Sequence, residues 1–187
     1  MPEVRIRQSL IVPRQSCRGR QVHLDPPLLG AARPPVDQHD GCRAAFVASS
    51  HAATLMAPRR RGLIVNVGYW PAQKHMGNVI NGIAKAATDK MTADMAHELR
   101  THGVTVVSLY PGLVRTEAVM LAAEGGWLDL SNSESPEFID RVVAALTADP
   151  ALIERSGRIL VAAAVASESG LTDVDGRRPT PLTLETA

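Results

Sequence analysis

Two short apolar runs constrain the fold of this chain more than any other feature. Residues 62–68 read GLIVNVG and residues 104–110 read VTVVSLY. Both runs are rich in β-branched residues and end at glycine or proline, which is typical of strands buried on both faces of a sheet. Between them, apolar residues recur at steps of three and four over 78–102, which predicts a long helix. A strand, a helix and a strand in this order predict two parallel strands joined by a crossover.

Three further segments extend this alternation. An alanine-rich stretch at 41–57 precedes the first run and predicts a helix. A second amphipathic stretch at 136–148 predicts another helix, and the run RILVAAA at 158–164 predicts a last strand. The sequence therefore predicts an α/β fold, in which a truncated Rossmann-like, doubly wound parallel sheet carries flanking helices.

The first 40 residues differ in character from the remainder. They hold six of the thirteen prolines and several arginines, and their apolar residues follow no helical or strand period. We interpret residues 1–40 as an irregular, extended or disordered arm and residues 41–187 as the folded domain. The arginine and proline bias also suits an alternative origin, in which the arm arises from an altered reading frame or start and is unrelated to the domain.

Bulk composition excludes several classes of function. A chain of 187 residues with 45% hydrophobic content and a formal charge of +1 is expected to form one soluble domain. It has no overall field that attracts nucleic acid, and no aromatic residue is interleaved with the arginines of the arm to stack on bases. No apolar run reaches the length of a membrane span or a signal peptide, so we expect neither and place the chain in the cytoplasm. Cys17 and Cys42 lack the spacing of a metal or redox motif.

Metal binding is not expected. His75 stands apart, and His97 and His102 lie five positions apart on the expected helix with no carboxylate or cysteine on a face shared with both. We predict that these histidines lie on the surface. Met91 and Met95 are expected to serve in packing.

Three ordered motifs resemble those of the short-chain dehydrogenase/reductase family. They are GLIVNV, the segment NVINGIAKAATDKMTADMAHELRTHGV and VSLYPGLVRTE, and the segments TADP, SGRILVAAA and GLTDVDGRRP resemble the member 1 branch of that family. The similarity covers roughly residues 41–180. It implies that the chain is the C-terminal portion of a short-chain dehydrogenase/reductase, an oxidoreductase that uses NAD or NADP on a small alcohol or carbonyl compound.

The resemblance also assigns catalytic positions. The family's lysine corresponds to Lys85, its tyrosine position to Asn81 and its serine position to Tyr69, while the asparagine of its proton relay falls near Gly41. The family's tyrosine moves the proton at the substrate oxygen, and the lysine lowers the pKa of that phenol and binds the nicotinamide ribose. A carboxamide such as Asn81 has no proton-transfer pKa near neutrality. We therefore expect a catalytically impaired or inactive chain.

The family's Pro-Gly-x-x-x-Thr segment corresponds to Pro111, Gly112, Val114 and Thr116. In the family this loop holds the nicotinamide carboxamide, so these residues are the expected cofactor contacts. A strand that ends in proline and glycine makes a similar turn in unrelated proteins, which is the alternative explanation. The glycine-rich turn that seats the pyrophosphate in the family has no counterpart in this sequence, so cofactor binding is in question.

Three alternatives stay open at this stage. Tyr69 beside Lys85 is a candidate for a relocated proton donor. A second alternative to the family role is that Lys85 is an ordinary solvated lysine on a helix surface. The third alternative is that the chain is a non-catalytic interaction protein. It would form a homo-oligomer through the helices at 41–57 and 78–102, which in the family pack against a partner subunit.

Overall fold

The structure, a computed structural model, describes residues 37–77, 79–126 and 128–187, and side chains from residue 41 onward. Its first elements are helix α1 (Asp37–Met56), strand β1 (Gly62–Val67), helix α2 (Val79–Leu99) and strand β2 (Val104–Tyr110). β1 and β2 are parallel, with Gly62 opposite Val104 and Val67 opposite Leu109. Strand β5 (Ile159–Val161) pairs with the other edge of β2, again in parallel, so the main sheet has the order β1-β2-β5. The predicted parallel sheet is confirmed.

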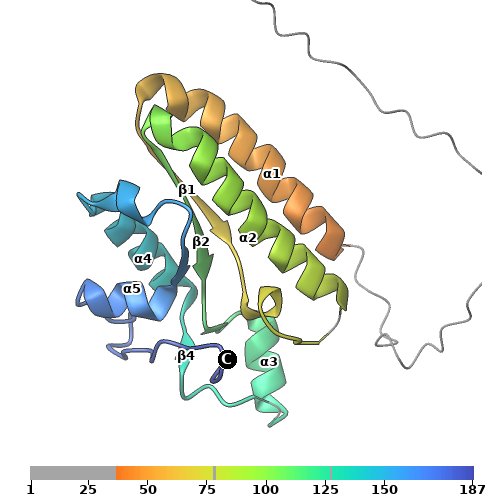
Figure 1. Ribbon diagram of the computed structural model, residues 1–187. Coiled ribbons are helices and arrows are strands. Elements are labelled where there is room, and N and C mark those ends of the chain that lie inside the picture. The colour runs from red at the N-terminus through yellow and green to blue at the C-terminus, as the bar shows by residue number, and fades with distance from the viewer. Residues whose placement is uncertain (1–36, 78, 127) are drawn as a thin grey trace, which may run out of the picture.

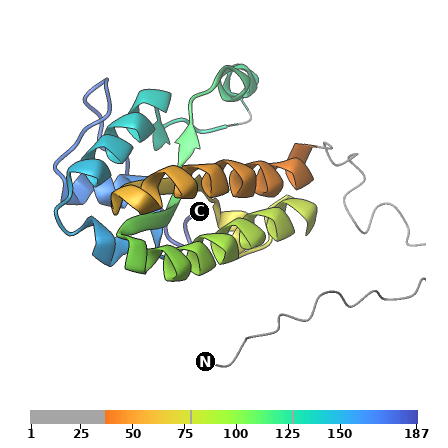
Figure 2. The ribbon, with the colours of Figure 1, turned by 90° about the horizontal axis from the view of Figure 1, so that it is seen from above.

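Helices cover both faces of this sheet, as in a doubly wound fold. α1 and α2 lie side by side on one face, while α4 (Pro136–Ala148) and α5 (Ala162–Glu168) cover the other (Figures 1 and 2). Successive side chains of the strands point to opposite faces. Ile64 and Val106 pack toward α1 and α2, whereas Val107 and Leu109 pack toward α4 and α5. All seven residues of β2 are buried, as expected of a strand covered on both faces.

The free edge of β1 has no partner strand within the described part of the chain. α1 and α2 lie over one face of the sheet beside that edge, and Val67, the last residue of β1, is 54% exposed. An unpaired edge leaves alternate backbone N–H and C=O groups without ladder partners. β1 is therefore an unpaired edge strand of the described sheet, whereas β2 beside it is buried along its whole length.

The end of α2 and the start of β2 meet the segment before β1 closely. After a short 3₁₀ turn at Arg100–His102, Gly103 adopts a left-handed conformation with φ of +67°. A Cβ atom at this position would lie 2.4 Å from the carbonyl oxygen of Arg60. Glycine is therefore required here both by the backbone angle and by the close approach.

Several expectations about the elements need correction. The last strand was predicted at 158–164, but β5 ends at Val161 and α5 begins at Ala162. α1 begins at Asp37, so its first four residues belong to a helix and not to the predicted arm; residues 1–36 of the arm lie outside the described residues. The sequence also did not indicate helix α3 (Glu117–Glu124) or the short parallel pair of β3 (Leu113–Val114) and β4 (Ser133–Glu134).

Candidate functional site

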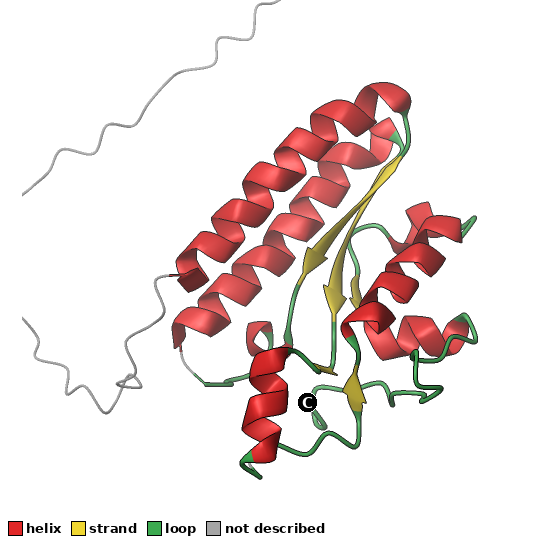
Figure 3. Cartoon of the chain, turned by 180° about the vertical axis from the view of Figure 1, so that it is seen from behind, coloured by secondary structure: helices red, strands yellow, loops and turns green. Residues whose placement is uncertain are grey.

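The candidate site lies where the strands of the main sheet end. β1 ends at Val67 and β2 at Tyr110, and both strands run in the same direction, so the residues that follow them emerge at the same edge. α3 and β4 lie beyond this edge (Figures 1 and 3). In open α/β sheets, ligands bind outside the carboxyl ends of the strands. The residues predicted from the sequence lie on α2 or in the segments that follow β1 and β2 at this edge, where Val114 belongs to the short strand β3.

Lys85 projects from α2 toward the end of β1. Its Nζ donates a hydrogen bond to the carbonyl oxygen of Val67 at 3.2 Å, and its side chain is half-buried. Burial lowers the pKa of Lys85, and the nearby carboxylate of Asp89 opposes this in part. Asn81, one turn earlier on the same helix, lines with Lys85 a groove of about 720 Å³ bounded by α1, β1 and α2. The spacing of four residues thus places the two positions on one helix face.

Tyr69 lies in a different setting. It is half-buried in extended backbone and caps a short 3₁₀ helix at Trp70–Ala72, where the N–H of Ala72 donates to the Tyr69 carbonyl at 3.1 Å. Tyr69 is not among the residues that line the groove of Asn81 and Lys85. The hypothesis that Tyr69 acts as a relocated proton donor stays a prediction.

Gly68 makes the close packing at the end of β1 possible. Its N–H donates to the carbonyl of Leu109 at 3.0 Å. A Cβ atom at Gly68 would lie 2.3 Å from Ser108 Oγ and 2.4 Å from a ring carbon of Tyr110. Glycine at position 68 therefore leaves room for the Tyr110 ring on the neighbouring strand.

A polar cluster around Asp89 was missed by the sequence analysis. The Ser108 hydroxyl donates to one carboxylate oxygen of Asp89 at 2.6 Å, and the Tyr110 phenol donates to the other. Burial, followed by the hydrogen bond to Asp89, raises the pKa of Tyr110, while the hydrogen bond from Gln73 lowers it. The Trp70 ring meets the Tyr110 ring edge-on, with centroids 5.2 Å apart. The spacing of Asp89, four residues after Lys85, was the available signal.

The loop after β2 is held by a buried carboxylate. The N–H of Gly112 donates to Glu134 Oε2 at 2.9 Å, and a Cβ at Gly112 would lie 2.9 Å from the other carboxylate oxygen. Burial raises the pKa of Glu134, partly opposed by the Gly112 hydrogen bond, with Asp173 raising it further and Arg115 lowering it. β3, which contains Val114, pairs with β4, which contains Glu134. Glu134 was not indicated by the sequence.

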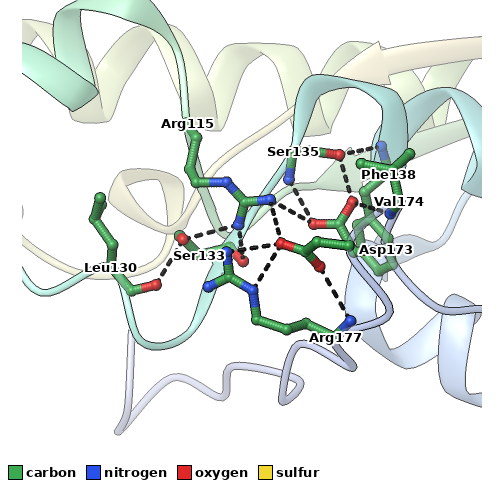
Figure 4. A network of polar contacts seen from close by, with 9 residues as sticks. Arg115, Leu130, Ser133, Ser135, Phe138, Asp173, Val174 and Arg177 are labelled. Carbon is green, nitrogen blue, oxygen red and sulfur yellow. Dashed lines mark hydrogen bonds and ion pairs between the residues drawn. The ribbon is translucent and has the colours of Figure 1, made fainter.

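Arg115 connects this loop to a segment far along the chain (Figure 4). It donates to the Ser133 carbonyl at 2.9 Å and pairs with the carboxylate of Asp173 at 2.9 Å. Asp173 in turn accepts hydrogen bonds from both the N–H and the hydroxyl of Ser135. Burial disfavours ionisation of Asp173, but the hydrogen bonds from Ser135, Val174 and Arg115 outweigh it and lower the pKa. The loop, the start of α4 and the segment around Asp173 therefore form one fixed unit.

Thr116 ends the loop and begins α3. Its hydroxyl oxygen accepts the N–H of Val119 at 3.4 Å, which makes it the N-cap of the helix. The threonine of the Pro-Gly-x-x-x-Thr segment therefore has a structural partner as well as an exposed position. Its hydroxyl hydrogen is still able to donate.

The described residues contain no group of three or more histidines, cysteines or carboxylates able to hold a metal ion. His75, His97 and His102 are exposed. Met95 is buried between α2 and the sheet, and Met91 packs against the same cluster, in agreement with their predicted packing role. No helix in the described part of the chain has the length and apolar character needed to cross a membrane.

Comparisons with known proteins agree with this arrangement of a parallel sheet and a loop at its carboxyl edge, which is that of a Rossmann-like α/β fold. The model of the short chain dehydrogenase family matches residues 41–125. The chain belongs to the short-chain dehydrogenase/reductase family. It is 43% identical over 148 residues to dehydrogenase/reductase SDR family member 1 of Mus musculus and 40% identical to that of Homo sapiens.

The resemblance is to part of these relatives. The alignments cover 73% of this chain and 47% of each relative, so the chain spans about half the length of the curated relatives it matches. A solved structure of 4-hydroxyisoleucine dehydrogenase complexed with NADH is similar with a TM-score of 0.52 and 25% identity, over 65% of this chain and 53% of that one. The predicted branch and the restriction to part of the family's domain are confirmed.

Proposed function

We propose that this chain is a short-chain dehydrogenase/reductase relative that keeps the nicotinamide side of the family's site and is catalytically impaired or inactive. One observation carries the proposal. Lys85 and the loop from Pro111 to Thr116 belong to the same carboxyl edge of the sheet, because Lys85 contacts the end of β1 and the loop begins at the end of β2. The class of substrate is a small alcohol or carbonyl compound.

The donor set fits the nicotinamide end of NAD or NADP. Lys85 is an ammonium with three donors and one hydrogen bond to Val67, so it is suited to bind ribose hydroxyls. Pro111, Gly112, Val114 and Thr116 would hold the carboxamide, and their loop is braced by Glu134 and Arg115. When bound, the nicotinamide supplies hydride transfer. The described residues contain no glycine-rich turn that would hold the pyrophosphate, which argues for weak binding.

Impairment follows from the side chains at the proton-transfer positions. Asn81 occupies the position of the family's tyrosine and has no proton-transfer pKa near neutrality. Tyr69 occupies the serine position, where its ring is larger than the hydroxymethyl group that would orient the substrate oxygen. Lys85 alone does not replace these two groups, since its family role is to assist the tyrosine.

Titration of the purified chain with NADH and NADPH, followed by nicotinamide fluorescence and calorimetry, tests the proposal. We expect weak saturable binding in the millimolar range that is lost in Lys85→Met. Lys90→Met is the matched control, because Lys90 lies on the same helix with an exposed side chain paired to Asp94. Binding that is equal in both variants, or no binding by a folded chain, would contradict a retained nicotinamide half-site.

A second candidate function is non-catalytic self-association through α1 and α2. The observation that favours it is the set of large apolar side chains that these two helices expose: Phe46, Val47 and Leu55 on α1, and Val79 and Ile83 on α2. Contiguous exposed apolar surface marks interaction sites in soluble proteins. A homo-oligomer that buries these side chains would account for them without any catalytic role.

A further inference from the structure

We propose that Lys85 is a carbonyl-capturing amine, which condenses with an apolar aldehyde held in the groove between α1, β1 and α2 to form an imine. This activity goes beyond the proposed nicotinamide half-site and requires no cofactor. It is assigned from the position of the amine in the groove, which Asn81 also lines and Tyr69 does not.

The groove has the size of a small-molecule site and a lining that is partly apolar. Its volume of about 720 Å³ falls within the range of small-molecule pockets, about 300–1,000 Å³. The apolar part of its lining is formed by Ala45, Ala48, Ala52, Leu63, Val65 and Ala84, and Ser49, Asn66 and Thr88 add polar side chains. Lys85 is the one lysine among the groove-lining residues. An aldehyde whose hydrocarbon tail lies on these walls would present its carbonyl carbon to a single amine.

The surroundings of Lys85 make its ammonium easier to deprotonate than that of a fully exposed lysine. Its described hydrogen bond is to the Val67 carbonyl, and no carboxylate forms an ion pair with it among the residues that the structure describes. Asp89, one turn away, has one oxygen engaged by Ser108 and the other by Tyr110. Burial lowers the pKa of Lys85, against the weaker opposing effect of Asp89. A desolvated lysine amine is the usual nucleophile for Schiff-base formation.

The other lysines of the chain are placed differently. The sequence contains three lysines, at positions 74, 85 and 90. Lys74 donates to the carbonyl of Leu184 at 3.0 Å and also to that of Ala187. The side chain of Lys90 is 73% exposed and pairs with Asp94. Neither lines the groove, so they serve as internal references within the same molecule.

The chemistry balances without an external oxidant or reductant. The nitrogen lone pair of Lys85 attacks the aldehyde carbon, a C–N bond forms and the carbonyl π electrons pass to oxygen, giving a carbinolamine after proton transfer from nitrogen to oxygen. The oxygen then leaves as water, taking the second nitrogen proton through solvent, and a C=N bond remains. One amine and one aldehyde thus give one imine and one water.

The test is reductive trapping. The full chain is incubated with hexanal and cyanoborohydride at neutral pH, and the alkylation of each lysine is followed over time by peptide mass spectrometry. We expect Lys85 to be alkylated roughly tenfold faster than Lys74 and Lys90, because the groove holds the aldehyde beside the amine. The rate at Lys85 should saturate with hexanal concentration and should be slowed by hexanol, which fits the groove but has no carbonyl group.

Variants complete the design. Lys85→Arg keeps the charge but removes the nucleophile, and should abolish the fast labelling while Lys74 and Lys90 react as before. Lys90→Arg should leave the fast labelling intact. Equal alkylation rates at the three lysines would overturn the proposal. So would a rate at Lys85 that rises linearly with hexanal concentration and is unchanged by hexanol. NADH titration tests the nicotinamide half-site and reductive trapping tests the aldehyde site. Absence of either activity is therefore distinguishable from absence of the other.

Discussion

Tyr110 donates its phenol hydrogen bond to the carboxylate of Asp89, and this contact joins the last residue of β2 to the middle of α2. Ser108, two residues earlier on the strand, donates to the other carboxylate oxygen. The helix that carries Lys85 and the strand that leads into Pro111 are thus joined at one side chain. Removal of the Asp89 side chain should therefore disturb the position of both Lys85 and the loop that begins at Pro111.

Asp89→Ala should lower the free energy of unfolding by about 2–4 kcal/mol, because two buried hydroxyls lose a charged acceptor. Urea unfolding followed by circular dichroism measures this. Asp94→Ala, on the same helix, removes a partner of the exposed Lys90 and should cost no more than about 0.5 kcal/mol. Similar losses in the two variants would show that the Asp89 cluster does not stabilise the fold.

Tyr110 should make the fold sensitive to alkali. Burial and the hydrogen bond to Asp89 raise the pKa of Tyr110 in the folded chain, whereas an unfolded tyrosine ionises near pH 10. The stability gained from the protonated phenol is therefore complete below about pH 10 and is lost as pH rises toward the folded value. Tyr110→Phe should flatten the fall in unfolding free energy above about pH 10.

Absorbance supplies an independent check. The chain has two tyrosines, so Tyr69→Phe leaves Tyr110 as the one phenol. In this variant the phenolate absorbance should appear together with the loss of the circular dichroism signal. Phenolate formation in a fully folded chain near pH 10 would contradict the buried hydrogen bond.

Asp173→Ala should lower the free energy of unfolding by about 3–5 kcal/mol, since it leaves the largely buried Arg115 without its closer carboxylate partner. Asp175→Ala is the matched control, because Asp175 also pairs with Arg115 but is 34% exposed, and should cost about 1 kcal/mol or less. The pKa of Asp173 is lowered in the fold, so its stabilisation is present above the unfolded value near pH 4 and is lost as pH falls further. Acid unfolding midpoints of the two variants measure this difference.

Glu134→Gln should raise the free energy of unfolding at pH 7 by up to about 1 kcal/mol, because the amide oxygen still accepts from Gly112 without a buried charge. Burial raises the pKa of Glu134. Its protonated form therefore stabilises the fold below the unfolded pKa, near pH 4.3, and this contribution is lost as pH rises through the folded value. The advantage of the variant should shrink toward pH 4. Glu137→Gln, at an exposed position of α4, should show no such trend.

Phe46→Ser combined with Ile83→Ser should weaken self-association at least about tenfold in sedimentation experiments, if α1 and α2 form the interface. These two side chains are 54% and 56% exposed. Leu121→Ser removes an apolar side chain of α3 that is 68% exposed, more than either of these, and should leave the association unchanged. A loss of association in Leu121→Ser alone would assign the interface to another surface.

The sequence predicted the elements that carry a strong local pattern. β2 and α4 lie at their predicted residues, and α2 with its terminal turn fills most of the range predicted for the long helix. The run after Arg158 was misassigned because VAAAVA is compatible with either element. Pairing with the neighbouring strand determines where the strand ends, since β5 pairs with β2 from Ile159 to Val161.

The candidate site could be predicted only where a motif marks it. Lys85 and the loop from Pro111 to Thr116 lie in such motifs. Glu134 and Asp173 act through contacts with residues 22 and 58 positions earlier, and no local pattern encodes such a separation. The same holds for the groove, because its walls come from two helices and the free edge of β1.

The link between Arg115 and Asp173 also bears on synthesis. β1, α2 and β2 are synthesised before residue 173 and contact one another, although β2 also pairs with the later strand β5. The loop after β2 is in a different position, because Arg115 and Ser135 acquire their shared carboxylate only when Asp173 emerges. The loop at the carboxyl edge of the sheet can therefore acquire these contacts only after most of the chain has been synthesised.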